Sequence, residues 1–63
     1  MGNIGEKIKK KRIEKNLKQY ELAKLADMSN TFLSDIETGR SSPAIKTLEK
    51  IAKVLEIDIK EFF

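Results

Sequence analysis

Five residues with short polar side chains recur at helical spacing in the middle of this 63-residue chain. They are Asn30, Thr31, Ser34, Asp35 and Thr38. An advance of about 100° per residue places them on one side of a helix, opposite Leu33 and Ile36. Amide, hydroxyl and carboxylate groups recognise base edges in the major groove of DNA: Asn pairs with adenine, a Thr methyl group contacts thymine, and Asp accepts from cytosine N4. This polar face is therefore a candidate for recognising a base sequence.

The residues needed for other kinds of chemistry are missing or scattered. The sequence has no His and no Cys, which excludes the usual nucleophile pairs, zinc sites and disulfides. It has no glycine-rich phosphate loop, and its carboxylates are dispersed over positions expected to face solvent. We therefore expect no enzymatic activity, no metal, no cofactor and no small-molecule substrate.

The basic residues are concentrated at one end of the chain. Residues 1–18 carry a net charge of +5, whereas the remainder carries −2. A localised positive field is typical of a protein that binds a polyanion, although a solvated helix face would have the same composition. Four lysines of the first helix (Lys9, Lys10, Lys11 and Lys15) cannot all face DNA, so some of them must be solvated.

The length and hydropathy indicate one small domain over residues 1–63 that packing alone must stabilise. The longest apolar runs have two or three residues, far fewer than the roughly 20 that span a bilayer. The first residues lack the apolar stretch of a signal peptide. We therefore expect a soluble, cytoplasmic protein that does not enter a membrane.

Helical spacing explains the apolar residues, and signals for strands are absent. The spacing predicts helices over about 3–15, 19–26 and 30–37. The residues expected to face the core from these helices are Ile4, Ile8, Ile13, Leu22, Ala23, Ala26, Leu33 and Ile36.

Local signals mark where these helices end. Asn16 and Asp27 tolerate a left-handed backbone, which suits the turns after the first and second helices. Ser29 can accept a hydrogen bond as the N-cap of the third helix, and Gly39 can end that helix.

The second half of the chain predicts two more helices. Ser42 is the expected N-cap of the fourth helix, with Pro43 at its first position. The apolar residues expected to face inward are Ala44, Ile45, Leu48, Ile51, Ala52 and Leu55. Asp58 and Glu61 resemble a capping box that opens a short fifth helix. The predicted fold is all-α, with five helices in one compact domain.

Several segments in order resemble the phage-repressor and Cro family, often called the XRE family. They are QYELA (19–23), LSDIETGR (33–40) and LEKIA (48–52), with Ser29 and Pro43 between them. The resemblance extends from Ile4 to Phe63. It implies a lambda-repressor-like fold with a helix-turn-helix at about 19–38, whose second helix enters the major groove of double-stranded DNA. It also implies a transcriptional regulator, in particular a repressor that binds a palindromic operator as a homodimer.

The resemblance assigns roles to individual residues. Base contacts are implied for the polar face of the third helix: Asn30, Thr31, Ser34, Asp35 and Thr38. Backbone contacts are implied for Gln19, Tyr20, Arg40, Ser41 and Ser42. Gln19 matches a residue that also braces the recognition helix in relatives. Arg12 and Glu37 match an ion pair that links the first helix to the end of the third.

The sequence leaves four questions open. Lys18 replaces the usual N-cap Ser or Thr, which would leave Glu21 without its capping-box partner. Asp35 either contacts DNA or is engaged only locally. The segment 57–63 is the candidate homodimer surface, but its two phenylalanines would equally well close the core. An alternative function is that of an antitoxin or anti-repressor module, which would need apolar groups at the outward positions of the third helix.

Overall fold

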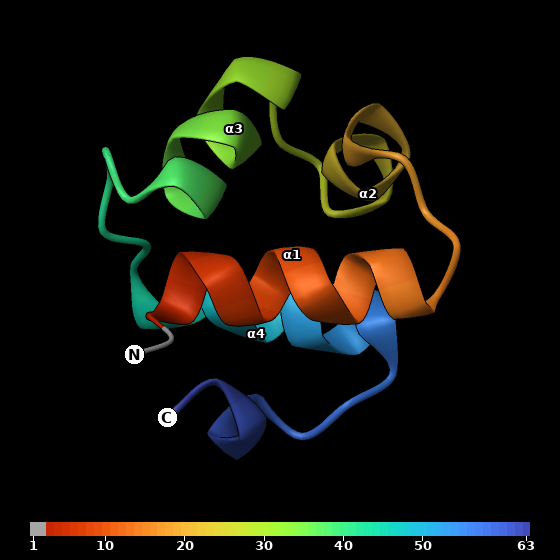
Figure 1. Cartoon of the computed structure of the whole chain (residues 1–63), viewed down its shortest axis with the longest axis vertical. Coiled ribbons are helices and arrows are strands. Elements are labelled where there is room, and N and C mark those ends of the chain that lie inside the picture. Colours follow the sequence, from red (N-terminus) through yellow and green to blue (C-terminus); the bar gives the residue numbers. More distant parts are fainter. Residues whose placement is uncertain (1–2) are drawn as a thin grey trace.

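The computed structural model describes residues 3–63, and this part of the chain contains only helices and loops. Its elements are α1 (Ile4–Glu14), α2 (Gln19–Leu25), α3 (Asn30–Thr38), α4 (Ile45–Leu55) and a single 3₁₀ turn, η1 (Ile59–Phe62) (Figure 1). The predicted all-α, lambda-repressor-like class is confirmed, with four α-helices and a 3₁₀ turn in place of five helices. Within the described residues, no helix combines the length and apolarity needed to cross a bilayer.

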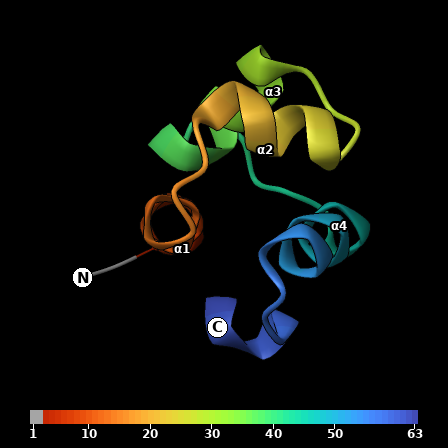
Figure 2. The same ribbon diagram turned by 90° about the vertical axis from the view of Figure 1, so that its right-hand side faces the viewer.

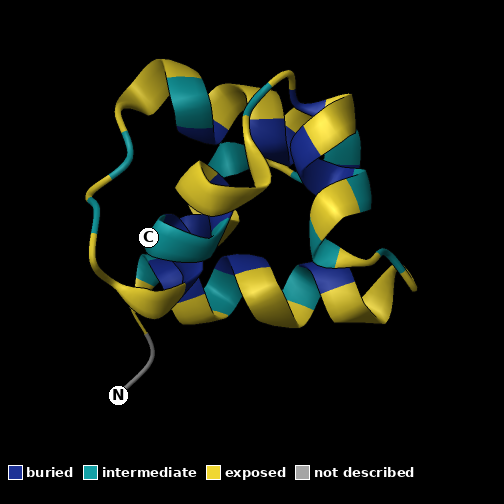
Figure 3. Cartoon of the chain, turned by 90° about the horizontal axis from the view of Figure 1, so that it is seen from above, coloured by how far each residue is buried: buried dark blue, intermediate teal, exposed yellow. Residues whose placement is uncertain are grey.

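The helices form a small cluster around one core. In Figure 1, α2 and α3 lie above α1, α4 runs behind α1, and η1 lies below them. The view from the side shows α1 and α4 next to each other beneath the α2–α3 pair (Figure 2). The buried faces turn toward the middle of this arrangement (Figure 3). The core consists of Ile8, Leu22, Ala23, Ala26, Leu33, Ile36, Leu48, Ile51, Ala52, Leu55 and Phe62.

The local signals act at the first three helices as predicted. Asn16 and Asp27 adopt positive φ angles of 59° and 58°. The Ser29 hydroxyl accepts a hydrogen bond from the Phe32 amide at 3.0 Å. Asn3 also caps α1, because its side chain accepts from the Glu6 amide at 2.8 Å. These contacts involve residues at most four apart, so they form before tertiary packing is complete.

The predicted inner face of α1 is wrong at one position. Ile13 is 55% exposed, whereas Arg12 is buried together with Gly5 and Ile8. Positions 5, 8 and 12 follow helical spacing, and Ile13 lies about 100° away from that line. The expectation failed because it counted only apolar residues, and the tertiary structure buries a charged one.

The predicted start of α4 is also wrong. The helix begins at Ile45, and Ala44 is its N-cap without a side-chain hydrogen bond. Ser42 therefore caps nothing, and Pro43 lies in the extended segment before the helix. The fixed φ of proline suits an extended backbone as well as a first helical turn. Ala44 and Ile45 are exposed, contrary to their expected inward position.

The C-terminal segment differs from the predicted fifth helix. The Asp58 carboxylate accepts from the Lys60 amide at 3.0 Å, so it closes a turn shorter than a capping box. Phe62 is buried and closes the core, whereas Phe63 is 65% exposed. The open question about the two phenylalanines is thus answered separately for each of them.

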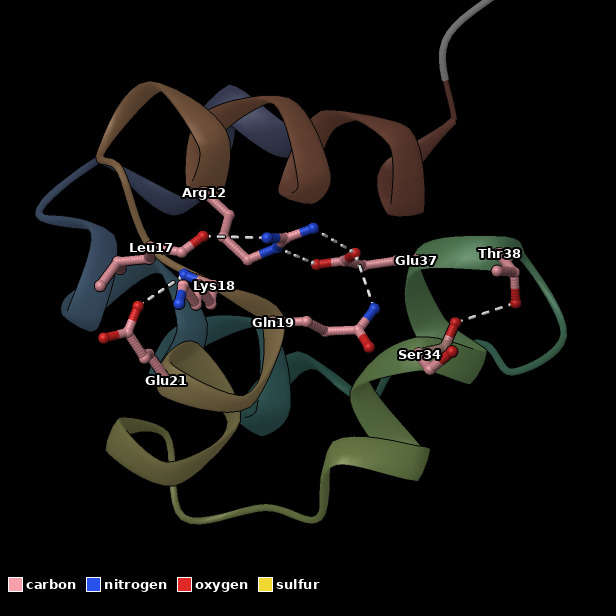
Figure 4. Close-up of polar contacts among 8 residues, drawn as sticks. All are labelled: Arg12, Leu17, Lys18, Gln19, Glu21, Ser34, Glu37 and Thr38. Carbon is pink, nitrogen blue, oxygen red and sulfur yellow. Dashed lines mark hydrogen bonds and ion pairs between the residues drawn. The ribbon is translucent and has the colours of Figure 1, made fainter.

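The Glu21 side chain does not lose its partner. Its carboxylate accepts a hydrogen bond from the Lys18 amide at 2.7 Å, which is one half of a capping box (Figure 4). The other half needs an acceptor on the side chain of the N-cap residue, and lysine has none. The departure at Lys18 therefore removes one hydrogen bond at the start of α2.

Candidate nucleic-acid interface

A tight connection sets α2 against α3. Residues 26–29 join the two helices, and Asp27 takes the left-handed conformation there. The Met28 amide donates to the Ala23 carbonyl at 2.9 Å, which closes the end of α2. The two helices then pack through Leu22, Ala23 and Leu33, all of which are buried. This fixes the direction in which α3 leaves the turn.

The five polar residues share the outer face of α3. Asn30, Thr31 and Thr38 are exposed, and Ser34 and Asp35 are half-buried. Leu33 and Ile36 are buried beneath them, as predicted. The Thr38 hydroxyl donates to the Ser34 carbonyl at 2.9 Å, so its oxygen stays available as an acceptor (Figure 4).

A buried ion pair connects α1 to the end of α3. Arg12 Nε lies 2.8 Å from Glu37 Oε2, and Arg12 Nη2 lies 3.1 Å from Glu37 Oε1 (Figure 4). The side chains are only 10% and 2% exposed. Arg12 Nη1 also donates to the Leu17 carbonyl at 2.9 Å, which ties down the loop between α1 and α2. The predicted pair is therefore present, and the guanidinium joins three segments of the chain.

Gln19 completes this network from the start of α2. Its Nε2 donates to Glu37 Oε1 at 3.1 Å, as Figure 4 shows. The bracing of α3 that the family resemblance implied is therefore observed. An amide nitrogen carries two hydrogens, so one N–H of Gln19 remains for another acceptor. Its contact with a DNA phosphate stays a prediction.

The loop after α3 begins with a left-handed glycine. Gly39 has a φ of 84°, and the amides of Arg40 and Ser41 both donate to the Asp35 carbonyl, at 2.8 and 3.2 Å. The Arg40 guanidinium lies 4.0 Å from the Asp35 carboxylate and is 80% exposed. The negative charge on the outer face of α3 therefore has a cation beside it.

Gly5 is a positioning residue that the sequence analysis missed. A Cβ atom at this position would lie 2.8 Å from the Glu37 carbonyl oxygen and closer still to that of Ile36. Only a glycine lets α1 approach the last turn of α3 so closely. A signal was present in the sequence, because Gly5 shares the helical spacing of Ile8 and Arg12.

Two lysines of α1 are engaged with the C-terminal half of the chain. Lys11 Nζ lies 3.2 Å from Glu61 and 3.8 Å from Glu14, and Lys15 Nζ lies 3.8 Å from Glu56. The hydrogen bond to Glu61, with the charges of both carboxylates, raises the pKa of Lys11 above its ordinary value. These two lysines stabilise the packing of α1 and are not free to meet a polyanion.

Two short helices at a fixed angle, a tight turn between them and a polar outer face on the second define a helix-turn-helix protein. The model of the helix-turn-helix family matches residues 8–62. The chain belongs to this family, as the resemblance in the sequence indicated.

Curated relatives come from a bacteriophage. The chain is 54% identical over 56 residues to the ImmF control region 10 kDa protein of Bacillus phage phi105, which covers 89% of this chain and 62% of that protein. It is 41% identical over 56 residues to the immunity repressor protein of the same phage, covering 89% and 39%. The chain thus spans less than two thirds of the length of either relative.

A solved structure has the same arrangement of helices. The biofilm regulator SinR, in a crystal structure with DNA, superimposes with a TM-score of 0.87 at 38% identity. The match covers 90% of this chain and 92% of that one. The fold is therefore shared over nearly the whole domain.

Proposed function

We propose that this chain is the sequence-specific DNA-binding module of a transcriptional repressor. The observation that carries the proposal is the outer face of α3, where short polar side chains lie over a buried apolar face. The Arg12, Glu37 and Gln19 network holds this face at a fixed angle to α2. Recognition in the major groove needs such a preorganised helix, because hydrogen bonds to base edges depend on direction. The module acts by binding in the cytoplasm and not as an enzyme.

The proposed contacts follow the two surfaces that the structure places side by side. The base contacts come from α3, and the backbone contacts come from the start of α2 and from the loop after α3. The residues of α3 are Asn30, Thr31, Ser34, Asp35 and Thr38. The backbone residues are Gln19, Tyr20, Arg40, Ser41 and Ser42. Phosphate contacts fix the register of a protein on DNA, and base contacts select the sequence.

The relatives support a role in repression. One is named an immunity repressor protein, and SinR was crystallised with DNA. A module that only bound a protein partner would need apolar groups on the outer face of α3. Asn30, Thr31 and Thr38 stand there instead, so the antitoxin or anti-repressor alternative has no support from this face.

We further propose that the protein binds a palindromic operator as a homodimer. Two recognition helices reach successive major grooves when the half-sites lie about 34–36 Å apart. The segment 57–63 is the proposed dimer surface. Its apolar residue Phe63 is exposed, while its neighbour Phe62 closes the core.

Selection from random duplexes at about 0.1 M salt tests sequence-specific binding. We expect an enriched two-fold symmetric motif. Asn30→Ala and Thr31→Ala should each relax the preference at one base position, by about 1–3 kcal/mol for a lost bidentate contact. Thr47→Ala on α4 is the matched control and should leave the motif unchanged. Recovery of no motif by the unmodified protein would overturn the proposed function.

A further inference from the structure

A hollow lies between α1 and the last turn of α3, beside the candidate DNA-binding face. It has a volume of about 790 Å³. Its lining residues are Asn3, Glu6, Lys9, Lys10, Ile13, Glu14, Glu37 and Thr38. Thr38 belongs to the outer face of α3, so the hollow borders the surface proposed to enter the major groove. Its lining includes three carboxylates and two ammonium groups.

Each of the three carboxylates already has a partner within the chain. Glu6 accepts a hydrogen bond from the Asn3 amide at 3.3 Å as part of the α1 cap. Glu14 lies 3.8 Å from Lys11 Nζ. Glu37 is held by Arg12 at 2.8 Å and by Gln19 at 3.1 Å. The carboxylates are therefore engaged in capping and packing.

The two lysines of the hollow differ from the other basic residues of α1. Lys9 and Lys10 are exposed, and neither takes part in an ion pair among residues 3–63. Lys11 and Lys15, in contrast, are paired with carboxylates of the C-terminal half. The structure thus divides the basic cluster into a pair that stabilises the fold and a pair that faces the hollow.

We propose that Lys9 and Lys10 bind phosphates of the DNA strand that flanks the recognition helix. This inference rests on the proposed function, because it requires α3 to lie in the major groove. A duplex held there presents a sugar-phosphate backbone at each edge of the groove, and the hollow lies at the Thr38 edge of α3. Ammonium groups without an internal partner release counterions from DNA when they reach a phosphate. They add affinity without adding sequence preference.

The test is the salt dependence of binding to the selected operator, measured for four proteins. Lys9→Ala/Lys10→Ala removes the two proposed contacts, and Lys9→Arg/Lys10→Arg keeps their charge. Lys50→Ala/Lys53→Ala is the matched control, since these lysines line a hollow with Leu25 and Val54 that includes no residue of α3. Circular dichroism and thermal unfolding of each variant verify that the fold is intact.

We expect the slope of log K against log salt to fall by about 0.9 for each lost phosphate contact in Lys9→Ala/Lys10→Ala. For two contacts, the unmodified protein should lose about 12-fold more affinity than this variant when salt rises fourfold. The arginine variant and the control should keep the original slope, and all variants should select the same motif.

Equal slopes in the Lys9→Ala/Lys10→Ala variant and the control would overturn the inference while leaving the proposed function intact. Failure of the unmodified protein to select any motif would overturn both. An altered motif in the Lys9→Ala/Lys10→Ala variant would also contradict the inference, because phosphate contacts carry no base information.

Discussion

Glu37 is the single residue on which the geometry of the candidate interface depends most. Its carboxylate accepts from Arg12, which belongs to α1, and from Gln19, which begins α2, while Glu37 itself lies in the last full turn of α3. A side chain that is 2% exposed is held in one position by these three hydrogen bonds. The angle between α2 and α3 is therefore fixed by polar contacts as well as by the apolar core.

Removing one partner of this pair should cost more than removing both. Glu37→Ala leaves the Arg12 guanidinium buried without a counter-charge, which we expect to lower the free energy of unfolding by about 3–5 kcal/mol. That loss is comparable with the whole stability of a small domain. Arg12→Met/Glu37→Leu should lose much less, because no buried charge remains. Urea unfolding measures both variants, and equal losses would contradict a desolvated pair.

Asp35 illustrates a role that geometry narrows without deciding. Its carboxylate lies 4.0 Å from Arg40, and its carbonyl accepts from two amides of the next loop. An exposed pair at this distance contributes little to stability. Its proximity means that a duplex approaching α3 meets the two opposite charges together. The base contact proposed for Asp35 therefore depends on where Arg40 moves when DNA binds.

At the scale of elements, the contact between α1 and α3 depends on the absence of a side chain. Gly5→Ala places a methyl group against two backbone carbonyls of α3, and a backbone cannot move aside as a flexible side chain can. We expect a loss of about 1–3 kcal/mol in the free energy of unfolding, despite the better helix propensity of alanine.

Lys10→Ala is the control for this prediction, since it introduces alanine into the same helix at an exposed position. It should change the free energy of unfolding by less than about 0.5 kcal/mol. Thermal or urea unfolding gives both values. A Gly5→Ala protein as stable as the Lys10→Ala protein would show that α1 does not pack closely on α3 in solution.

At the scale of the whole molecule, the C-terminal segment has two separate tasks. Phe62 is buried in the core, and the Lys11–Glu61 ion pair ties the same turn to α1. Phe63 stays 65% exposed, so it is free for the proposed contact between two copies of the chain. The segment can close the monomer and present an apolar residue at the same time.

Phe63→Ser should therefore shift the monomer–dimer equilibrium toward monomer without unfolding the domain. Sedimentation equilibrium measures the shift, and circular dichroism checks the helices. Ile13→Ser is the control, because Ile13 is similarly exposed but lies on α1. It should leave the equilibrium unchanged. An unmodified protein that is monomeric at all concentrations, or an equal shift in both variants, would exclude the segment 57–63 as the dimer surface.

The sequence by itself determined the class of fold, the positions of most helix ends and the polar face of α3. These features depend on neighbours within about four residues: the cap at Ser29, the left-handed Asn16 and Asp27, and the period of 3.6 residues in the apolar pattern. The Arg12–Glu37 pair was predicted only through the family resemblance, since its partners are 25 residues apart.

Only the tertiary structure decided which residues of a similar type do different work. It buried Arg12 and exposed Ile13, placed Phe62 inside and Phe63 outside, and paired Lys11 but left Lys9 at the hollow. It also moved the start of α4 to Ile45. The physical reason is that partners distant in sequence meet only when the helices pack, and a local pattern carries no information about which face that packing covers.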